Sequence, residues 1–457
     1  MKNRIIALFL ILMIVVCSLI SCARPGEYES DDVRNNTAAH PDKKGSEEAE
    51  AEAPADIDMD APTDVIAELY TSDDMSISAG SVSSEADGAL KAEISADPSA
   101  TVDADGTPPE AAEPIEAGTL TAGEWKDNDN YDFWKGLFER EEWQGFADSW
   151  KLIPYMRFAV TLTNGQNAAK NVRIEMYAGE HLMASAVSDS YGKAYLNPHL
   201  LTQTPTGDLV GADRLVVYSG SESREYAITP DDLTAGGMTI NDVGGEKFTK
   251  LDLMFVIDTT GSMGDELEYL KKELGNVIST VSEENDSLDV ALSLNFYRDD
   301  GDEYVVKSNP FTSDIQDALN RLDKEYSDGG GDFPEAVDLA LNDALSSHDW
   351  REKSIKLLFL VLDAPPHGDN EKTVESIGLS IAEAAKMGVR IIPIASSGID
   401  TETEFLLRIM SLASGGTYTF LTDDSGVGES HLEPTIGDYN VKKLNDLLVK
   451  IINEYCK

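Results

Sequence analysis

The sequence contains a nearly unbroken apolar run, Leu251-Asp-Leu-Met-Phe-Val-Ile257, followed at once by Asp258-Thr-Thr-Gly-Ser-Met263. Such a run is typical of a strand that is covered on both faces, as in a parallel sheet. The segment from Asp265 to about Glu283 repeats apolar residues at helical spacing, which predicts an amphipathic helix. We therefore expect a strand, a polar loop and a helix in succession, the repeating unit of an α/β fold.

The same alternation continues towards the C-terminus. Further strands are predicted at 288–296, 355–362, 389–395 and 417–421, and helices at 313–325, 334–347, 373–387, 402–413 and 440–455. This order predicts a doubly wound, mostly parallel sheet over residues 250–457. Because parallel strands end at one edge of the sheet, the loops that follow them gather there, and binding sites form among these loops.

Side chains with oxygen atoms occupy three of these loops. They are Asp258, Thr260 and Ser262 in the first, Ser327 and Asp332 in the second, and Asp363 in the third. Alternate spacing in an extended loop points the first three side chains the same way. Hydroxyl and carboxylate oxygens suit Mg²⁺, Mn²⁺ or Ca²⁺ rather than Zn²⁺ or Cu²⁺. The alternative for Asp258 is a strand-end carboxylate that only caps a helix.

These residues resemble the von Willebrand factor type A domain and its metal-ion-dependent adhesion site. The family pattern is Asp-x-Ser-x-Ser in the first loop, Thr in the second and Asp in the third, and Asp258-x-Thr260-x-Ser262 keeps the hydroxyls. The second-loop Thr is absent, and Gly329-Gly-Gly-Asp332-Phe-Pro-Glu335 stands in its place. Asp332 is the candidate that replaces this Thr, and Ser327 is the second choice. In the third loop, Asp363 matches the family pattern, although the residue before it is Leu where the family usually has Thr.

The resemblance implies a function as well as a fold. In the family, a carboxylate from a protein partner completes the coordination of the bound cation, for which we expect Mg²⁺ or else Mn²⁺ or Ca²⁺. Thr260 and Ser262 are then expected to bind the ion directly, and at least one Asp through water. His367 is expected to be a packing or surface residue. The acidic hairpin Tyr297-Arg-Asp-Asp-Gly-Asp-Glu303 follows the second strand to the same edge, and is either a solvated turn, which we favour, or a second cation site.

Two further segments precede the α/β domain. Residues 121–150 contain four of the five tryptophans, which we interpret as the core of a short helical segment rather than as a stacking platform for sugars. Residues 151–232 contain short alternating runs that predict a small β-sandwich, and residues 233–249 form the linker. Ser188-Asp-Ser-Tyr-Gly-Lys-Ala-Tyr-Leu196 resembles carboxypeptidase-regulatory-like and transthyretin-like sandwiches, which are usually spacers or accessory modules.

The N-terminus carries an export signal. Lys2 and Arg4 precede an apolar run from Ile5 to Ile20, as in a secretory signal peptide. Leu19-Ile-Ser-Cys22 resembles the bacterial lipobox. This resemblance implies a signal peptide at residues 1–21 and a lipid on Cys22. The protein would then be lipid-anchored in a bacterial cell envelope, on the extracytoplasmic side. The alternative is an uncleaved anchor with an incidental cysteine.

Residues 22–120 are expected to form a disordered acidic stalk. From residue 23 to residue 120 the chain has 25 acidic and 5 basic residues. A segment with so much like charge and so few aromatic residues buries too little apolar surface to offset its ordering entropy.

Composition narrows the class of protein. The chain of 457 residues has 36 Lys+Arg against 84 Asp+Glu, a net charge of −48, which argues against nucleic-acid binding. Three cysteines are too few for a disulfide framework. With no Ser-His-Asp pattern, catalytic Cys or phosphate loop, the sequence favours a non-enzymatic binding or adhesion protein. The alternatives are a solute-binding lipoprotein of a transporter, which needs two similar lobes, and an envelope protein whose metal is purely structural.

Overall fold

The computed structural model describes residues 119–457, except 154–155, 199, 201–210, 332 and 426–429. The expected signal peptide, the lipid site Cys22, residues 22–118 of the expected acidic stalk, and Asp332 lie outside the described residues. The expected end of the stalk is wrong at Leu120, which is buried in the core beside α7 and α12. The chain divides into units Met1–Met59 and Asp60–Lys457, and every described residue belongs to the second. In the part that is described, no helix is long and apolar enough to cross a membrane.

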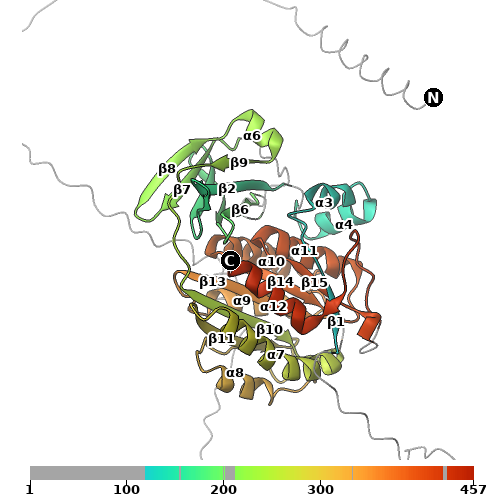
Figure 1. Ribbon diagram of the computed structural model, residues 1–457. Coiled ribbons are helices and arrows are strands. Elements are labelled where there is room, and N and C mark those ends of the chain that lie inside the picture. Colours follow the sequence, from blue (N-terminus) through green and yellow to red (C-terminus); the bar gives the residue numbers. More distant parts are fainter. Residues whose placement is uncertain (1–118, 154–155, 199, 201–210, 332, 426–429) are drawn as a thin grey trace, which may run out of the picture. The chain divides into compact units, whose positions relative to one another are not determined.

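A mostly parallel sheet forms the centre of the C-terminal half (Figure 1). Its strands, in spatial order, are β12 (Val306–Lys307), β11 (Asp289–Tyr297), β10 (Lys250–Asp258), β13 (Ser354–Leu362), β14 (Val389–Ala395), β15 (Tyr418–Thr422), β1 (Thr121–Trp125) and β16 (Lys442–Lys443). The five strands from β11 to β15 pair in parallel, whereas β12 and β1 pair antiparallel with their neighbours. The predicted α/β fold with a mostly parallel sheet is confirmed.

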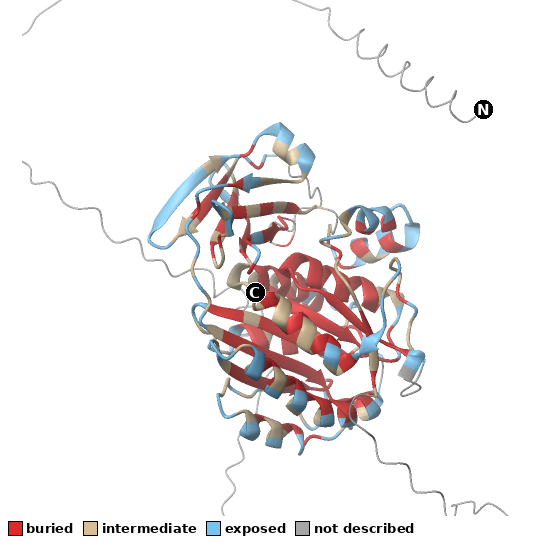
Figure 2. Cartoon of the chain, in the orientation of Figure 1, coloured by how far each residue is buried: buried red, intermediate tan, exposed pale blue. Residues whose placement is uncertain are grey.

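Helices cover both faces of this sheet (Figure 1). They are α7 (Gly264–Glu284), α8 (Ile315–Leu322), α9 (Val337–Ser346), α10 (Glu371–Met387), α11 (Thr401–Ser414) and α12 (Leu444–Tyr455), with short 3₁₀ turns at Gly261–Met263 and Asp423–Ser425. Met254 and Val256 of β10 pack into the core with α9, α10 and α11, and Leu253 and Phe255 into the core with α7 and α12. Figure 2 shows the central strands buried, which explains why β10 reads as an unbroken apolar run.

The N-terminal segment packs onto the same α/β domain. β1 pairs with β15, and the helices α3 (Tyr131–Leu137) and α4 (Glu141–Ser149) follow it. Trp134 and Trp143 are fully buried, and Trp134 lies parallel to the ring of Phe405 in α11, with centroids 6.4 Å apart. These tryptophans belong to the core, as predicted, and are not an exposed platform.

Between α4 and β10 the chain forms a module of two four-stranded sheets around one apolar core. One sheet contains β3 (Asn167–Ala168), β2 (Phe158–Asn164), β6 (Lys193–Leu196) and β9 (Gly237–Ile240). The other sheet contains β5 (His181–Val187), β4 (Arg173–Ala178), β7 (Arg214–Ser219) and β8 (Glu222–Ala227). The short helix α6 (Pro230–Ala235) precedes β9. β9 lies in the stretch assigned to the linker. Gly237 permits this pairing, because a Cβ there would meet the carbonyl oxygen of Ala159 at 2.2 Å.

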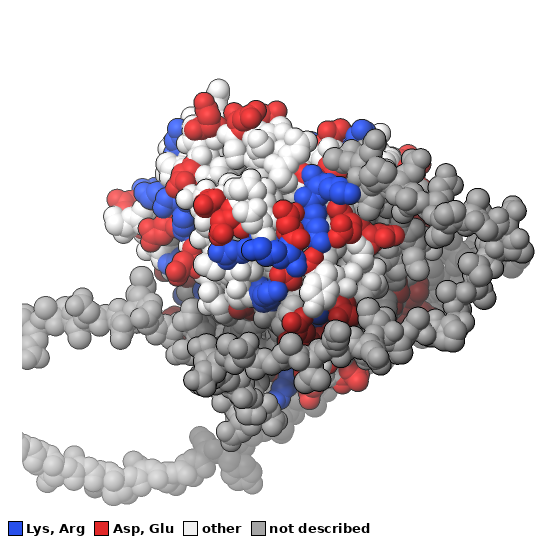
Figure 3. Space-filling view, turned by 90° about the horizontal axis from the view of Figure 1, so that it is seen from below, with Lys and Arg blue, Asp and Glu red and all other residues white. Residues whose placement is uncertain are grey.

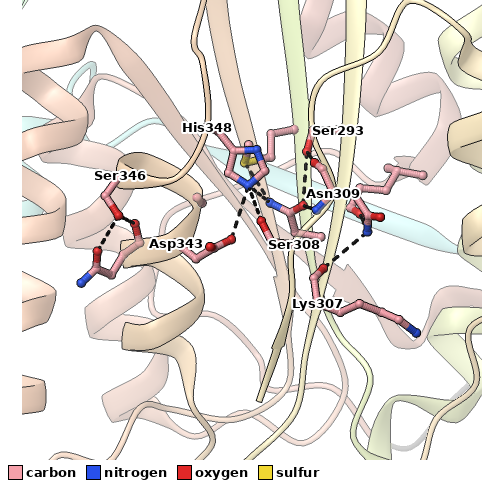
Figure 4. A network of polar contacts seen from close by, with 12 residues as sticks. Ser293, Lys307, Ser308, Asn309, Asp343, Ser346 and His348 are labelled. Atoms are coloured by element: carbon pink, nitrogen blue, oxygen red, sulfur yellow. Dashed lines mark hydrogen bonds and ion pairs between the residues drawn. The ribbon is translucent and has the colours of Figure 1, made fainter. Parts of the chain in front are cut away.

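A polar network fixes the edge of the central sheet beside β11 (Figure 4). His348 Nε2 lies 2.9 Å from Asn295 Nδ2, 3.0 Å from Ser308 Oγ and 3.3 Å from Asp343 Oδ2. Asn295 Oδ1 accepts a hydrogen bond from the backbone of Asn309 at 2.8 Å. The network joins β11, the segment after β12 and α9, so it holds the hairpin that leads to the candidate site.

Candidate metal centre

The first loop is organised by Asp258 at the end of β10. Its Oδ1 accepts hydrogen bonds from the backbone N–H of Thr260 at 2.8 Å and from Thr260 Oγ1 at 2.7 Å. Asp258 is completely buried, and its Oδ2 has no hydrogen-bond partner. One carboxylate oxygen therefore shapes the loop, and the other accepts no hydrogen bond within the described residues, although the nearby Tyr297 hydroxyl acts to lower the pKa of Asp258.

Ser262 and Asp363 complete the group of predicted residues that the structure brings together. Ser262 Oγ lies 3.4 Å from Thr260 Oγ1, and the nearby Ser262 hydroxyl acts to lower the pKa of Asp363. Asp363 directly follows β13, is 5% exposed, and has an unpartnered Oδ1. Of the two second-loop candidates, Asp332 lies outside the described residues, and Ser327 packs against Gly264 at the start of α7.

Glu335 is a site residue that the sequence interpretation missed. It is 3% exposed, its backbone N–H donates to Pro365 O at 2.9 Å, and its Oε2 has no hydrogen-bond partner. A Cβ on Gly330 would lie 2.9 Å from Glu335 Oε1 and 3.3 Å from Thr260 Cβ, so both side chains flank this glycine. Glu335 therefore lies near Thr260, in the second loop where the expected Thr is absent from the sequence.

The acidic side chains of this edge raise one another's pKa values. Burial and the charge of Asp363 raise the pKa of Asp258 to about 7. Burial raises the pKa of Asp363 to about 6. The pKa of Glu335 rises to about 9, mainly because the side chain is buried and also because of the negative charges of Asp258, Asp299, Asp363 and Asp302. The charged groups that shift these three pKa values are all acidic, so a cation would relieve the repulsion among them.

The donor atoms fit a hard divalent cation. In the described part of the chain, no three His, Cys, Asp or Glu side chains are placed to hold a metal ion by themselves. An ion at this edge would therefore need the hydroxyls of Thr260 and Ser262 besides the carboxylates. Such a mixed set of oxygen donors matches the preference of Mg²⁺, Mn²⁺ and Ca²⁺.

Arg298 holds the surrounding loops in place. Its side chain is 1% exposed, and it donates from Nε to Thr259 O at 3.2 Å and from a terminal nitrogen to Tyr326 O at 2.7 Å. Its guanidinium also lies over the rings of Tyr304 and Tyr326, 4.7 and 5.0 Å from their centroids. One buried cation thus connects the first loop, the second loop and the hairpin after β11.

The acidic hairpin 297–303 lies at this edge, as predicted, but two of its carboxylates have structural partners. Asp302 Oδ2 accepts hydrogen bonds from the backbone of Asp299 at 3.1 Å and of Gly330 at 2.9 Å. Asp299 Oδ1 lies 2.8 Å from His367 Nε2. The favoured interpretation as a merely solvated turn is therefore wrong for Asp299 and Asp302, because they fasten neighbouring loops.

Comparison with known proteins identifies the domain around this edge. Residues 252–431 match the family model of the von Willebrand factor type A domain. The chain contains a type A domain. Such domains generally mediate protein interaction or adhesion, and many bind a divalent metal at a metal-ion-dependent adhesion site.

Two curated relatives share part of the chain. A putative ariadne-like RING finger protein, R811, of Acanthamoeba polyphaga mimivirus is 33% identical over 119 residues, which is 26% of this chain and 11% of that protein. Alpha-protein kinase vwkA of Dictyostelium discoideum is 28% identical over 123 residues, 26% of this chain and 19% of the kinase. The chain thus spans less than a fifth of the length of either relative.

Among solved structures, the chain is similar to the conserved hypothetical protein BatB from Bacteroides thetaiotaomicron. The sequences are 15% identical, the TM-score is 0.31, and the similarity covers 45% of this chain and 98% of that one.

The raised pKa of Glu335 predicts a pH dependence of stability. An acid whose pKa is higher in the folded than in the unfolded state stabilises the fold at low pH, and this contribution is lost as the pH rises through the folded value. Without divalent ions, the wild type should therefore lose stability relative to Glu335→Gln as the pH rises from 4.5, the ordinary pKa of glutamate, to about 9, the raised pKa of Glu335. Saturating Mg²⁺ should reduce the loss. Urea unfolding in EDTA at stepped pH measures it, and a wild-type-to-variant difference that stays constant with pH would contradict the prediction.

Proposed function

We propose that this chain is a surface-anchored binding or adhesion protein whose type A domain recognises a protein partner through a divalent cation, with Mg²⁺ favoured over Mn²⁺ and Ca²⁺. The observation that carries the proposal is the set of buried oxygens without hydrogen-bond partners, Asp258 Oδ2, Asp363 Oδ1 and Glu335 Oε2. They lie at the edge that also presents the hydroxyls of Thr260 and Ser262.

Each residue has a distinct part in this proposal. Thr260 and Ser262 offer hydroxyl oxygens to the ion, while Asp258 holds Thr260 in place through two hydrogen bonds. Asp363 lies near the Ser262 hydroxyl, and Glu335 offers a carboxyl oxygen from the second loop. When bound, the ion supplies a coordination position that a partner's carboxylate can take, which explains how so acidic a protein could bind an acidic group.

The proposal includes the setting of the domain. We propose a lipid anchor at Cys22, an extracytoplasmic place in a bacterial cell envelope, and a disordered stalk. The stalk ends before residue 120, because Leu120 is buried and accepts a hydrogen bond from the backbone of Leu444 at 2.8 Å. The two-sheet module at 158–240 is proposed as a transthyretin-like or carboxypeptidase-regulatory-like spacer. Support comes from its place in the chain, since it follows α4 and returns to β10 at the end of the sheet opposite the candidate metal centre.

Capture of a partner from envelope extract tests the proposal. The full chain should retain a partner in Mg²⁺, release it in EDTA and recover it when Mg²⁺ is restored, whereas Asp258→Ala should not retain it. In the same preparation, Cys22→Ala should lose the lipid and give either a chain with an uncleaved signal peptide or a soluble chain. Retention that is insensitive to both EDTA and Asp258→Ala would reject metal-dependent recognition, and a Cys22→Ala chain that stays lipid-modified would reject the anchor.

Other functions predict different results. A purely structural metal would raise the unfolding temperature without any partner capture. A solute-binding lipoprotein would bind a small molecule between two similar lobes, whereas the described residues contain one mostly parallel sheet. We propose that the chain is not an enzyme, and the match to a kinase does not argue otherwise, because it spans only 19% of that protein.

A further inference from the structure

We propose that a cleft at the edge of the central sheet opposite the candidate metal centre binds a neutral sugar ring. The cleft has a volume of about 290 Å³ and lies where three parts of the chain meet. They are residues 126–129 after β1, residues 189–195 at the start of β6, and residues 415–416 with 454–455 of the α/β domain. Small-molecule sites occur preferentially at such junctions. Residues 415–416 precede β15, whereas the candidate metal centre follows the parallel strands, so this inference does not depend on the cation proposed above.

Hydrogen bonds hold the walls of the cleft together. Asn128 donates from Nδ2 to Leu412 O at 2.8 Å, which fixes the segment after β1 on α11. Asn197, which directly follows β6, donates from Nδ2 to Ala413 O at 3.3 Å. The end of α11 thus contacts both of the other walls, and the cleft is formed without a ligand.

The turn between β5 and β6 places an aromatic side chain beside the cleft. Asp189 Oδ1 accepts hydrogen bonds from the backbone N–H groups of Tyr191 and Lys193, both at 2.8 Å. Gly192 has φ of 74° and packs so closely that a Cβ there would lie 2.3 Å from Leu162 O. Tyr191 itself is 47% exposed and lines the cleft. A well-ordered turn therefore presents an exposed aromatic ring to a ligand.

Tyr195 offers the cleft a hydroxyl that forms no hydrogen bond within the described part of the chain. The residue is only 8% exposed and lines the cleft. Burial raises the pKa of Tyr195, and the charges of Asp189 and Asp129, which line the same cleft, add to the rise. By contrast, the hydroxyl of Tyr455 donates to Gly415 O at 3.1 Å. The Tyr195 hydroxyl is thus the one of the two that is free to bind a ligand.

The charges that line the cleft are paired, which disfavours an ionic ligand. Lys126 Nζ lies 2.5 Å from Glu454 Oε2, and Lys193 Nζ lies 3.8 Å from Asp129 Oδ1. Asp189 is bound by the backbone of its own turn. A charged ligand would therefore have to break an ion pair or lie beside a charge of its own sign. Lys and Arg also lie among Asp and Glu on the face that Figure 3 shows, so paired charges alone do not mark a site, and the tyrosines distinguish this one.

A sugar ring matches this combination of groups. Its C–H face packs against an aromatic ring such as that of Tyr191. Each of its hydroxyls can both donate and accept, so they can bind the Tyr195 hydroxyl and the paired charges together. A volume of about 290 Å³ lies at the lower end of the range for small-molecule sites, which suits one ring, either free or at the end of a glycan. The two-sheet module would then supply a wall of a binding site and not only act as a spacer.

Ligand-observed NMR with the full chain in EDTA tests the proposal without any bound cation. The neutral probes are the methyl glycosides of glucose, galactose, mannose and N-acetylglucosamine, together with maltotriose and triacetylchitotriose. We expect saturation transfer to at least one of them at about 1 mM, because a ligand with a millimolar Kd is half bound there. Glucuronate and glucosamine, the charged controls, should bind more weakly, and high ionic strength should not weaken the neutral probe, since salt screens charges. Binding of the methyl glycosides alone indicates a free sugar, and binding of a trisaccharide as well indicates a glycan.

Three variants locate the binding. Tyr191→Ala should weaken binding of the probe about fivefold to tenfold, because it removes the exposed ring. Tyr195→Phe should weaken binding about threefold without lowering the unfolding temperature, because no described residue hydrogen-bonds to its hydroxyl. Phe333→Ala removes an exposed aromatic ring from the second loop beside the candidate metal centre, so it is the matched control and should bind the probe as the wild type does.

Two results would overturn the proposal. One is the absence of binding for every neutral probe, or equal binding by the wild type, Tyr191→Ala and Tyr195→Phe. The other is tighter binding of glucuronate or glucosamine than of the neutral probes, which would show that the cleft takes charged ligands. Because every measurement is made in EDTA, neither result bears on metal-dependent recognition at the opposite edge.

Discussion

Asp258→Ala is expected to weaken Mg²⁺ binding at least about a hundredfold while the chain stays folded. The substitution removes a completely buried carboxylate whose Oδ2 has no partner, so it removes negative charge from the candidate site. It also releases Thr260, because Asp258 Oδ1 accepts from both the backbone and the hydroxyl of that residue. Isothermal titration calorimetry of the full chain with Mg²⁺, Mn²⁺ and Ca²⁺ measures the loss.

The same variant should be at least as stable as the wild type in EDTA near pH 8. Burial and Asp363 raise the pKa of Asp258 to about 7, so the ionised carboxylate opposes folding above that pH when no metal is bound. Asp258→Asn keeps an oxygen for Thr260 and separates the loss of charge from the loss of loop structure. Asp265→Ala, which removes an exposed acid in the first turn of α7, is the matched control and should bind Mg²⁺ normally. A folded Asp258→Ala chain that binds Mg²⁺ as tightly as the wild type would show that the site is misplaced.

The sequence predicts the parallel strands well because each is buried on both faces. β10 and β13 read as apolar runs, and the loops after them must meet at one edge whatever the details of helix packing. This topological rule suffices to bring Asp258, Thr260, Ser262 and Asp363 together.

Other features depend on contacts that no local pattern encodes. β1 pairs Thr121 with Thr422, 301 positions later, and its short sequence has no period that marks an edge strand. Glu335 and Thr260 both lie beside Gly330 because the second loop turns sharply, with φ of 79° at Gly329 and 71° at Gly330, a conformation that glycine adopts readily. The glycines indicate a turn, but they do not indicate which acidic residue after them faces the site.

The second large effect is expected at Arg408, where a buried charge joins the N-terminal segment to α11. Arg408 Nε and a terminal nitrogen donate to Asp127 at 3.0 and 2.7 Å, and the other terminal nitrogen donates to Glu404 at 3.0 Å. All three side chains are completely buried, and the guanidinium lies 5.0 Å from the ring centroid of Trp134. Arg408→Met keeps much of the volume but leaves two carboxylates buried without their cation.

We expect Arg408→Met to lower the free energy of unfolding by about 3–5 kcal/mol, because removal of one partner leaves uncompensated buried charge. Urea denaturation followed by tryptophan fluorescence suits this test, since four of the five tryptophans lie between residues 121 and 150. The same substitution at a more exposed pair, Lys386→Met opposite Glu383, should cost less than about 1 kcal/mol.

A combined variant separates the charge from the packing. Arg408→Met together with Asp127→Asn and Glu404→Gln neutralises the whole group, so it should recover much of the stability lost in Arg408→Met alone. If Arg408→Met costs no more than Lys386→Met, then Arg408 does not hold the N-terminal segment on the type A domain. If the combined variant recovers nothing, the loss arises from packing against Trp134 and Trp143 rather than from unpaired charge.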